Sequence, residues 1–169
     1  MEDIQQYLNE LVGTVQNVDT KKITVSVDKE DTLNKLKINE LIIFSETNAD
    51  QKLIGIVTKI SKKRIDVGED DELNKEIEYS YNFCNATLVG TFYKKFSPTN
   101  NNVFKRAVNT YPEINSKVYL ADGKALSIIM NSLENEITSD KRLIIGKYAS
   151  NQDVRAILDG NKFLNAMLQ

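Results

Sequence analysis

Histidine is absent from the 169-residue sequence, and cysteine occurs only once, at Cys84. The absence of histidine excludes Ser-His-Asp and Cys-His catalysis, together with the histidine ligands that zinc usually takes. A single cysteine excludes an internal disulfide and any site built on several thiolates. We interpret Cys84, in the run Phe83-Cys84-Asn85-Ala86, as a small buried hydrophobic residue rather than a reactive thiol.

Glycine-rich phosphate loops are also missing. None of the seven glycines begins a Gly-x-x-x-x-Gly-Lys-[Ser/Thr] pattern, and no Gly-x-Gly-x-x-Gly occurs. The backbone cradle that binds nucleotide phosphates is therefore lacking. Carboxylates are plentiful, but they lie in polar stretches. Nothing in the sequence places two of them in an apolar cleft, where their pKa values would differ enough for one to act as an acid and the other as a base. We expect the chain itself to be no enzyme and to hold no cofactor.

Long apolar segments and a targeting signal are lacking too. No uninterrupted apolar run approaches the roughly 18 residues that a membrane-spanning helix needs, and the acidic start Met1-Glu2-Asp3 is unlike a signal peptide. We expect a soluble, cytoplasmic protein without a membrane partner. The net charge of −2 argues against a surface built throughout to coat nucleic acid. The length fits one domain, or one domain with an appended piece.

Short strands dominate what the sequence does contain. Ile23, Val25 and Val27 alternate with polar residues, and a polar turn at 19–22 joins this segment to a β-rich segment at 12–18, which predicts a hairpin. Roughly seven short strands with internal glycines predict a mainly β fold, a small closed or nearly closed β-barrel with one or two short helices. The other strands are expected at 41–44, 53–60, 83–93, 118–120, 143–148 and 154–158.

In the segment 53–60, the even positions Ile54, Ile56 and Ile60 are predicted to face one side of the strand. Gly55 lies on the opposite side and indicates a bulge or a barrel corner. The basic run Lys62-Lys63-Arg64 is predicted to end this strand.

Three segments have helical spacing. Apolar residues recur at intervals of three and four over residues 4–11. A second helix is predicted to start at Asp122-Gly123, with Asp122 as its N-cap and with Leu126, Ile129, Met130 and Leu133 along one side. A third helix is expected to start near Phe163.

The stretch 66–78 is strongly acidic, with seven carboxylates and one lysine. We interpret it as a solvated loop that extends from the fold, with a cation-binding site as the more specific alternative. A calcium loop needs alternating ligands around a central glycine, whereas Gly68 precedes the cluster. The carboxylates are Asp66, Glu69, Asp70, Asp71, Glu72, Glu76 and Glu78.

The stretch 79–111 has the opposite character, with a charge of +4 and no carboxylate. Aromatic residues interleave with its basic residues, a combination that can track a phosphate backbone and stack bases. The same pattern is compatible with a strand end and core aromatics, or with a protein-docking loop. The candidate contacts with a partner or with nucleic acid are Lys94, Lys95, Phe96, Lys105 and Arg106.

A set of short motifs, several of them with a glycine inside a strand, occurs in a fixed order along the chain. They are Val12-Gly13-Thr14-Val15, Leu41-Ile42-Ile43-Phe44 after Lys37-Ile38-Asn39-Glu40, Leu53-Ile54-Gly55-Ile56-Val57-Thr58-Lys59-Ile60, Ala86-Thr87-Leu88-Val89-Gly90, Tyr111-Pro112 with Val118-Tyr119-Leu120-Ala121, Leu143-Ile144-Ile145-Gly146-Lys147, and Ala156-Ile157-Leu158-Asp159 with Phe163-Leu164. Their order resembles the amino-terminal barrel of HerA-type ATPases, the hexameric DNA-pumping motors of bacteria and archaea. That module is called the HAS barrel, because a similar barrel begins the subunits of rotary ATP synthases. Asn115-Ser116 replaces a usual glycine of that family, and 66–78 looks like an insertion.

The resemblance implies a single HAS-barrel-like domain over residues 1–169, with a barrel core of about 12–158. Residues 159–169 would begin the connector to a P-loop ATPase domain, which would bind ATP and magnesium. Such a barrel packs beside copies of itself in a ring, expected to be a hexamer in the full-length protein. The barrel would recruit a nuclease or other effector to a DNA translocase or helicase. The translocase would act in DNA end processing or anti-phage defence, and the full assembly, rather than the barrel alone, would bind DNA.

Two alternatives come from other classes of protein. One is a stand-alone nucleic-acid-binding barrel of the OB type, suggested by the basic and aromatic segment 92–106. The other, ranked last, is a small metal-dependent hydrolase or nuclease that uses the carboxylates of 66–78.

Overall fold

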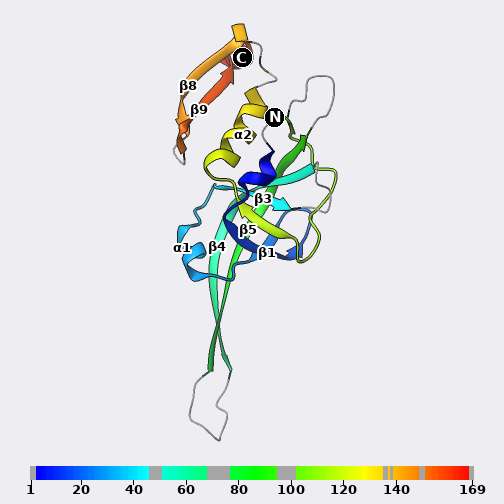
Figure 1. Cartoon of the computed structure of the whole chain (residues 1–169), viewed down its shortest axis with the longest axis vertical. Coiled ribbons are helices and arrows are strands. Elements are labelled where there is room, and N and C mark those ends of the chain that lie inside the picture. Colours follow the sequence, from blue (N-terminus) through cyan, green and yellow to red (C-terminus); the bar gives the residue numbers. More distant parts are fainter. Residues whose placement is uncertain are drawn as a thin grey trace, which may run out of the picture.

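Nine strands and three short α-helices form the part of the chain that the computed structural model describes, namely residues 3–45, 51–67, 77–94, 102–134, 137, 139–148 and 151–167. Two 3₁₀ turns, η1 and η2, accompany them (Figure 1). The elements are η1 Ile4–Tyr7, β1 Leu11–Val18, β2 Ile23–Ser26, α1 Glu30–Lys35, β3 Leu41–Ser45, β4 Gln51–Val67, β5 Ile77–Lys94, β6 Asn102–Lys105, β7 Lys117–Leu120, α2 Gly123–Glu134, η2 Ser139–Lys141, β8 Arg142–Tyr148, β9 Asn151–Asp159 and α3 Gly160–Met167.

Six strands close into an antiparallel barrel in the order β2-β1-β7-β3-β4-β5, because β2 also pairs with β5. The closing ladder joins Ile23 to Ala86 and Ser26 to Phe83. Strand β6 pairs with the C-terminal end of β5, residues 91–94, as an extra strand outside the closed barrel. The predicted mainly β fold with a small closed barrel is confirmed, and α1 is a short helix that the sequence pattern did not indicate.

Two glycines permit close approaches between barrel strands. A Cβ atom on Gly13 would collide with the backbone carbonyl of Ser26, and one on Gly90 would collide with the carbonyl of Lys105 and the ring of Phe104. Gly55 lies where the β4–β5 register shifts, but the extra residue at this point is Val89 of β5 rather than a residue of β4. The glycines therefore set how tightly neighbouring strands pack.

Apolar side chains form two cores on opposite sides of the barrel wall. One core fills the barrel interior and includes Val15, Val25 and Phe44. The other lies between the outer wall and α2, and includes Ile43 and Ile129. Strand β3 contributes side chains to both cores, Ile42 and Phe44 to the inner one and Ile43 to the outer one, because consecutive side chains point to opposite faces. Its predicted burial on both faces is confirmed, since Ile42, Ile43 and Phe44 are all inaccessible to solvent.

Strands β4 and β5 continue beyond the barrel as a two-stranded projection, which we call the arm (residues 62–67 and 77–82; Figure 1). The prediction that Lys62-Lys63-Arg64 ends the strand is wrong, because the ladder continues to the pair Val67 and Ile77. Lys62 and Lys63 are exposed, and their backbone stays extended because it pairs with Asn82 and Tyr81 of β5. The ends of the acidic stretch, Asp66 and Glu78, pair across the arm, and residues 68–76 lie outside the described part.

Two further expectations are corrected. The predicted first helix is only the single turn Ile4–Tyr7, because Leu11 already pairs with Tyr119 of β7. Ile54 and Ile60 do not share a face, since Ile54 belongs to the outer core and Ile60 packs on the inner core. A second register shift, between Val57 and Lys59, reverses the alternation between them.

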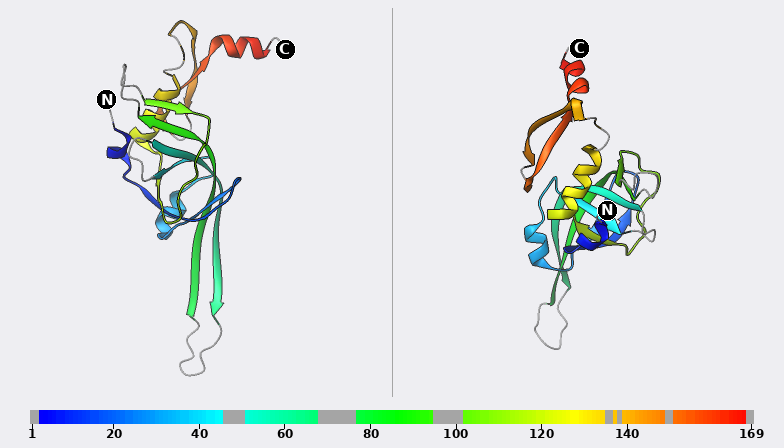
Figure 2. Two further views of the ribbon diagram at one scale, coloured as in Figure 1. Left: turned by 90° about the vertical axis from the view of Figure 1, so that its right-hand side faces the viewer. Right: turned by 45° about the horizontal axis from the view of Figure 1, so that its top comes forward.

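The C-terminal elements stand apart from the barrel. All six barrel strands fall between Leu11 and Leu120, whereas β8 and β9 form a separate two-stranded sheet. Helix α2 lies between that sheet and the barrel, and Val154 of β9 joins the outer core. Figure 2 shows β8, β9 and α3 at the end of the molecule opposite the arm.

We expect the substitution Gly13→Ala to destabilise the fold by about 2 kcal/mol, because the added methyl has no space against the backbone of β2. Equilibrium urea unfolding measures this free energy. Gln16→Ala, at an exposed position of the same strand, is the control and should change it little. Equal stability of both variants would contradict the close β1–β2 approach.

Candidate functional site

The five candidate contact residues do not form one surface. Lys94 ends β5, and its Nζ atom lies 2.9 Å from Oδ2 of Asp3. Both side chains are about one-third exposed or less. Lys94 therefore ties the N-terminal turn to the barrel.

Lys95 and Phe96 lie outside the described residues. Lys105 and Arg106, at and after the end of β6, are both exposed, and the Lys105 ammonium lies 5.6 Å from the ring centroid of Tyr93. The neighbouring Phe104 belongs to the outer core. Its ring, like that of Phe92, is buried and does not present a face on which a base could stack.

Lys105 and Arg106 line a groove of about 830 Å³ between the barrel, α2 and the β8–β9 sheet. We call it the β6–α3 groove. Its apolar lining includes Met130, Leu133 and Phe163. Its basic residues are Lys105, Arg106, Arg155 and Lys162.

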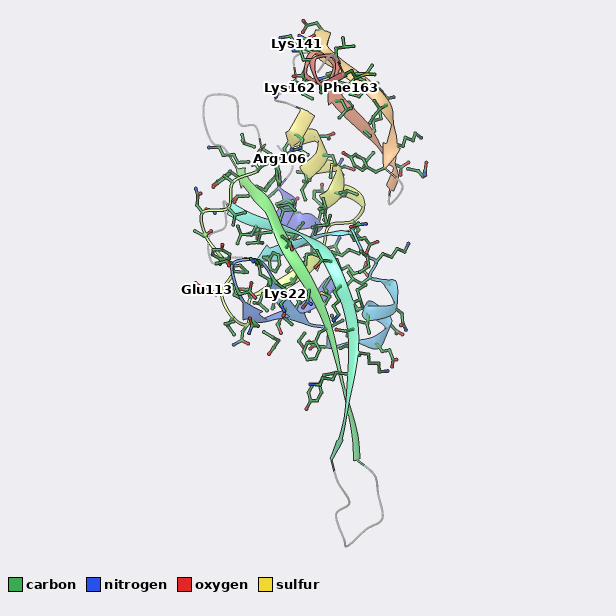
Figure 3. The ribbon with its side chains drawn as sticks, turned by 180° about the vertical axis from the view of Figure 1, so that it is seen from behind. Lys22, Arg106, Glu113, Lys141, Lys162 and Phe163 are labelled. Carbon is green, nitrogen blue, oxygen red and sulfur yellow. The ribbon has the colours of Figure 1, made fainter. Side chains whose placement is uncertain are left out.

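The charge balance of the β6–α3 groove is strongly positive. Among the lining residues that the structure describes, Asp159 is the one carboxylate. Its Oδ1 atom accepts hydrogen bonds from the backbone N–H groups of Asn161 at 3.0 Å and Lys162 at 3.3 Å. Asp159 thus caps α3, and its charge is engaged with the start of that helix. Figure 3 shows Lys162 and Phe163 at the α3 end and Arg106 at the adjacent edge of the barrel.

A second feature of the same end is exposed apolar surface on β8 and α3, which we call the β8–α3 face; it includes both sides of β8, because consecutive side chains of a strand point in opposite directions. Among the described residues, eleven large apolar side chains are exposed, and six of them belong to β8 and α3. Met167 is 69% exposed and Ile145 is 58% exposed. Soluble chains rarely leave such side chains together in water unless something covers them. The six residues are Leu143, Ile144, Ile145, Phe163, Leu164 and Met167.

Few buried contacts hold these C-terminal elements. Val154 is the one described residue of β8, β9 and α3 that is buried in a core, and Tyr148 packs against the same cluster. A two-stranded hairpin is only marginally stable by itself. A partner surface that covers the β8–α3 face would therefore stabilise these elements more than it would stabilise the barrel.

The described residues include no group of three or more carboxylates or thiols placed to hold a metal ion. No helix among them has the length and apolarity to cross a membrane. Cys84 is fully buried in the barrel core, and burial raises the pKa of its thiol to about 12. The interpretation of Cys84 as a core residue is confirmed.

Comparison with known proteins found no protein-family model that matches the chain and no curated protein that matches it.

Arg155, Lys162 and Phe163 were not among the residues that the sequence singled out. A signal was present, because residues 141–162 carry five basic side chains and two carboxylates within a chain of net charge −2. The spacing of these residues did not show that β9 and α3 would lie beside the end of β6.

We expect Asp3→Asn to destabilise the protein by about 1 kcal/mol or less at neutral pH, because it removes the charge that pairs with Lys94. The hydrogen bond from Lys94 and the one from the Gln5 N–H lower the pKa of Asp3. A lowered pKa contributes stability above the unfolded-state value, and this contribution is lost as pH falls through the folded-state value. The difference from wild type should therefore stay constant from about pH 7 down to about pH 5 and shrink as pH falls toward and below the ordinary value of 3.8.

Urea unfolding at several pH values measures this difference. Asp28→Asn, at an exposed carboxylate after β2, is the control and should stay close to wild type throughout. A cost for Asp3→Asn that is the same at every pH would contradict the ion-pair explanation.

The Cys84 thiol should not react with a thiol reagent at about pH 8 until the chain unfolds, because only the thiolate is nucleophilic. Absorbance after mixing with Ellman's reagent, with and without urea, follows the reaction. Rapid labelling of the folded chain would show that the barrel interior is open.

Proposed function

We propose that this chain is a non-catalytic assembly and docking barrel, as its resemblance to the amino-terminal barrel of HerA-type translocases implies. Copies of the chain associate through the β8–α3 face. The observation that carries this proposal is the exposure of six large apolar side chains on β8 and α3, none of whose described residues is buried in a core. Burying such surface is the main favourable term in protein association.

A neighbouring copy is a suitable partner for this face. The same apolar surface is present on every copy, so association needs no second protein. Within the described part, β8 pairs with β9 on one side only, which leaves its other backbone edge available for pairing. The barrel closes its own hydrogen bonds, so the arm and the C-terminal elements are the parts open to neighbours.

In the parent protein of this proposal, the barrels sit in a ring above P-loop motors. The motors bind ATP and magnesium and pump DNA, while the barrels help to set the ring and recruit a nuclease or other effector. The support within this chain is the resemblance of 156–164 to the connector that precedes such a motor, together with the lack of a P-loop in the chain itself.

The test replaces Ile145 and Leu164 with lysine, because both are 58% exposed and neither lines the β6–α3 groove. Light scattering coupled to size exclusion, over a range of concentrations, reports the mass. The wild-type chain should form assemblies larger than one chain, and the double variant should weaken association at least tenfold, because it places charge in an apolar contact.

The matched control is the double variant Ile38→Lys and Ile114→Lys. These isoleucines are 49% and 54% exposed and lie outside the β8–α3 face, so the control adds the same charge elsewhere. It should assemble like wild type. A wild-type chain that stays single at every concentration, or equal loss of association in both variants, would refute the proposal.

A further inference from the structure

The β6–α3 groove combines unpaired positive charge with an apolar floor. Arg106, Arg155 and Lys162 have no ion pair with any carboxylate in the described part of the chain, and Asp159 is engaged with α3. Three cations around one depression attract a common anionic ligand, since each gains from the same nearby negative charge.

The β8–β9 sheet adds to the positive charge beside the groove. Lys147 and Arg155 stand directly opposite each other in its ladder. Like charges in directly opposed positions destabilise a strand pair. Asp153 also lies in β9, two positions before Arg155, and an anionic ligand in the groove would add further opposite charge near Arg155.

The groove's chemistry favours a polypeptide over nucleic acid. Its floor presents Met130, Leu133 and Ile157, which bind hydrocarbon rather than phosphate or sugar. The rings of Phe92 and Phe104 are core residues and cannot stack bases, which leaves Tyr148 and Phe163 as the accessible aromatic side chains of the described lining. An amphipathic helix satisfies both parts of the groove, because its apolar side enters the floor while its acidic side faces the basic rim.

We propose that the β6–α3 groove binds an acidic amphipathic helix of a partner protein. This inference rests on the docking role proposed above and names the chemistry of the partner. The basic rim orients the helix and speeds the encounter, while the floor supplies the apolar contact that slows its release.

The probe is a fluorescein-labelled synthetic peptide of about 18 residues, rich in glutamate, with leucines at helical spacing. Fluorescence anisotropy measures its binding to the full chain. The double variant Arg106→Ala and Lys162→Ala should weaken binding about tenfold, because each exposed charge pair contributes modestly. Ile157→Ala should weaken binding as well, since it removes part of the apolar floor and lies outside the β8–α3 face.

The matched control is Lys21→Ala with Lys22→Ala, which removes two exposed positive charges from the β1–β2 turn, outside the groove lining. It should bind the probe like wild type. Because mass measurements on Ile145 and Leu164 test self-association separately, either proposal can fail while the other holds.

Three comparison ligands decide the identity of the occupant. Equal binding of a polyglutamate peptide without leucine would refute the role of the floor. Tighter binding of a single-stranded oligothymidine would make the groove a nucleic-acid site, and tighter binding of a peptide with this chain's residues 66–78 would make the occupant a second copy. Each of these results would overturn the proposal, as would no binding of the acidic probe at low salt.

Discussion

The pairing of β2 with β5 is the constraint on which the rest of this structure depends. Without the ladder from Ile23–Ala86 to Ser26–Phe83, the six strands would form an open sheet with two exposed edges. Closure requires β5 to pair with β2 along its middle while it pairs with β4 along its whole length, and β5 pairs with the extra strand β6 near its end. The register shifts in the β4–β5 ladder let two long strands bend enough to do this.

The alternation of side chains along β4 links the barrel to the candidate docking surfaces. Leu53 and Val57 fill the barrel while Ile54 packs outside it, under α2, because consecutive side chains of a strand point to opposite faces. Helix α2 then connects the barrel to β9 through the outer core, with Val154 as the anchor. The β6–α3 groove forms beside this narrow connection, and the β8–α3 face is left with little of the chain to cover it.

The barrel was predictable because its signals are local. Alternation over residues 23–27, the apolar run 41–44 and the internal glycines each follow from strand geometry and do not require knowledge of neighbours. The arm was mispredicted because Lys62-Lys63-Arg64 has the composition of a strand end, and only pairing with the distant segment 77–82 keeps it extended. Strand β6 was missed for a similar reason, since it is an edge strand of four residues whose partner is β5.

The candidate site was less predictable than the fold. Lys105 and Arg106 were recognised from local charge, but Lys94 is engaged with Asp3, a residue 91 positions away. Arg155 and Lys162 line the same groove as Lys105 and Arg106 only because α2 holds β9 beside the barrel. Packing between segments so far apart produces no repeating pattern in the sequence. Exposure of the β8–α3 face was equally hidden, because the run Leu143-Ile144-Ile145 has the composition of a buried strand.

Hydrogen exchange measured by mass spectrometry at low and high protein concentration tests the central claim, association through the β8–α3 face, most directly. We predict that backbone amides of β8 and α3 gain protection as concentration rises, while those of the arm do not, because only the β8–α3 face is buried between copies. Exchange that is unchanged in β8 and α3, with or without new protection elsewhere, would contradict it.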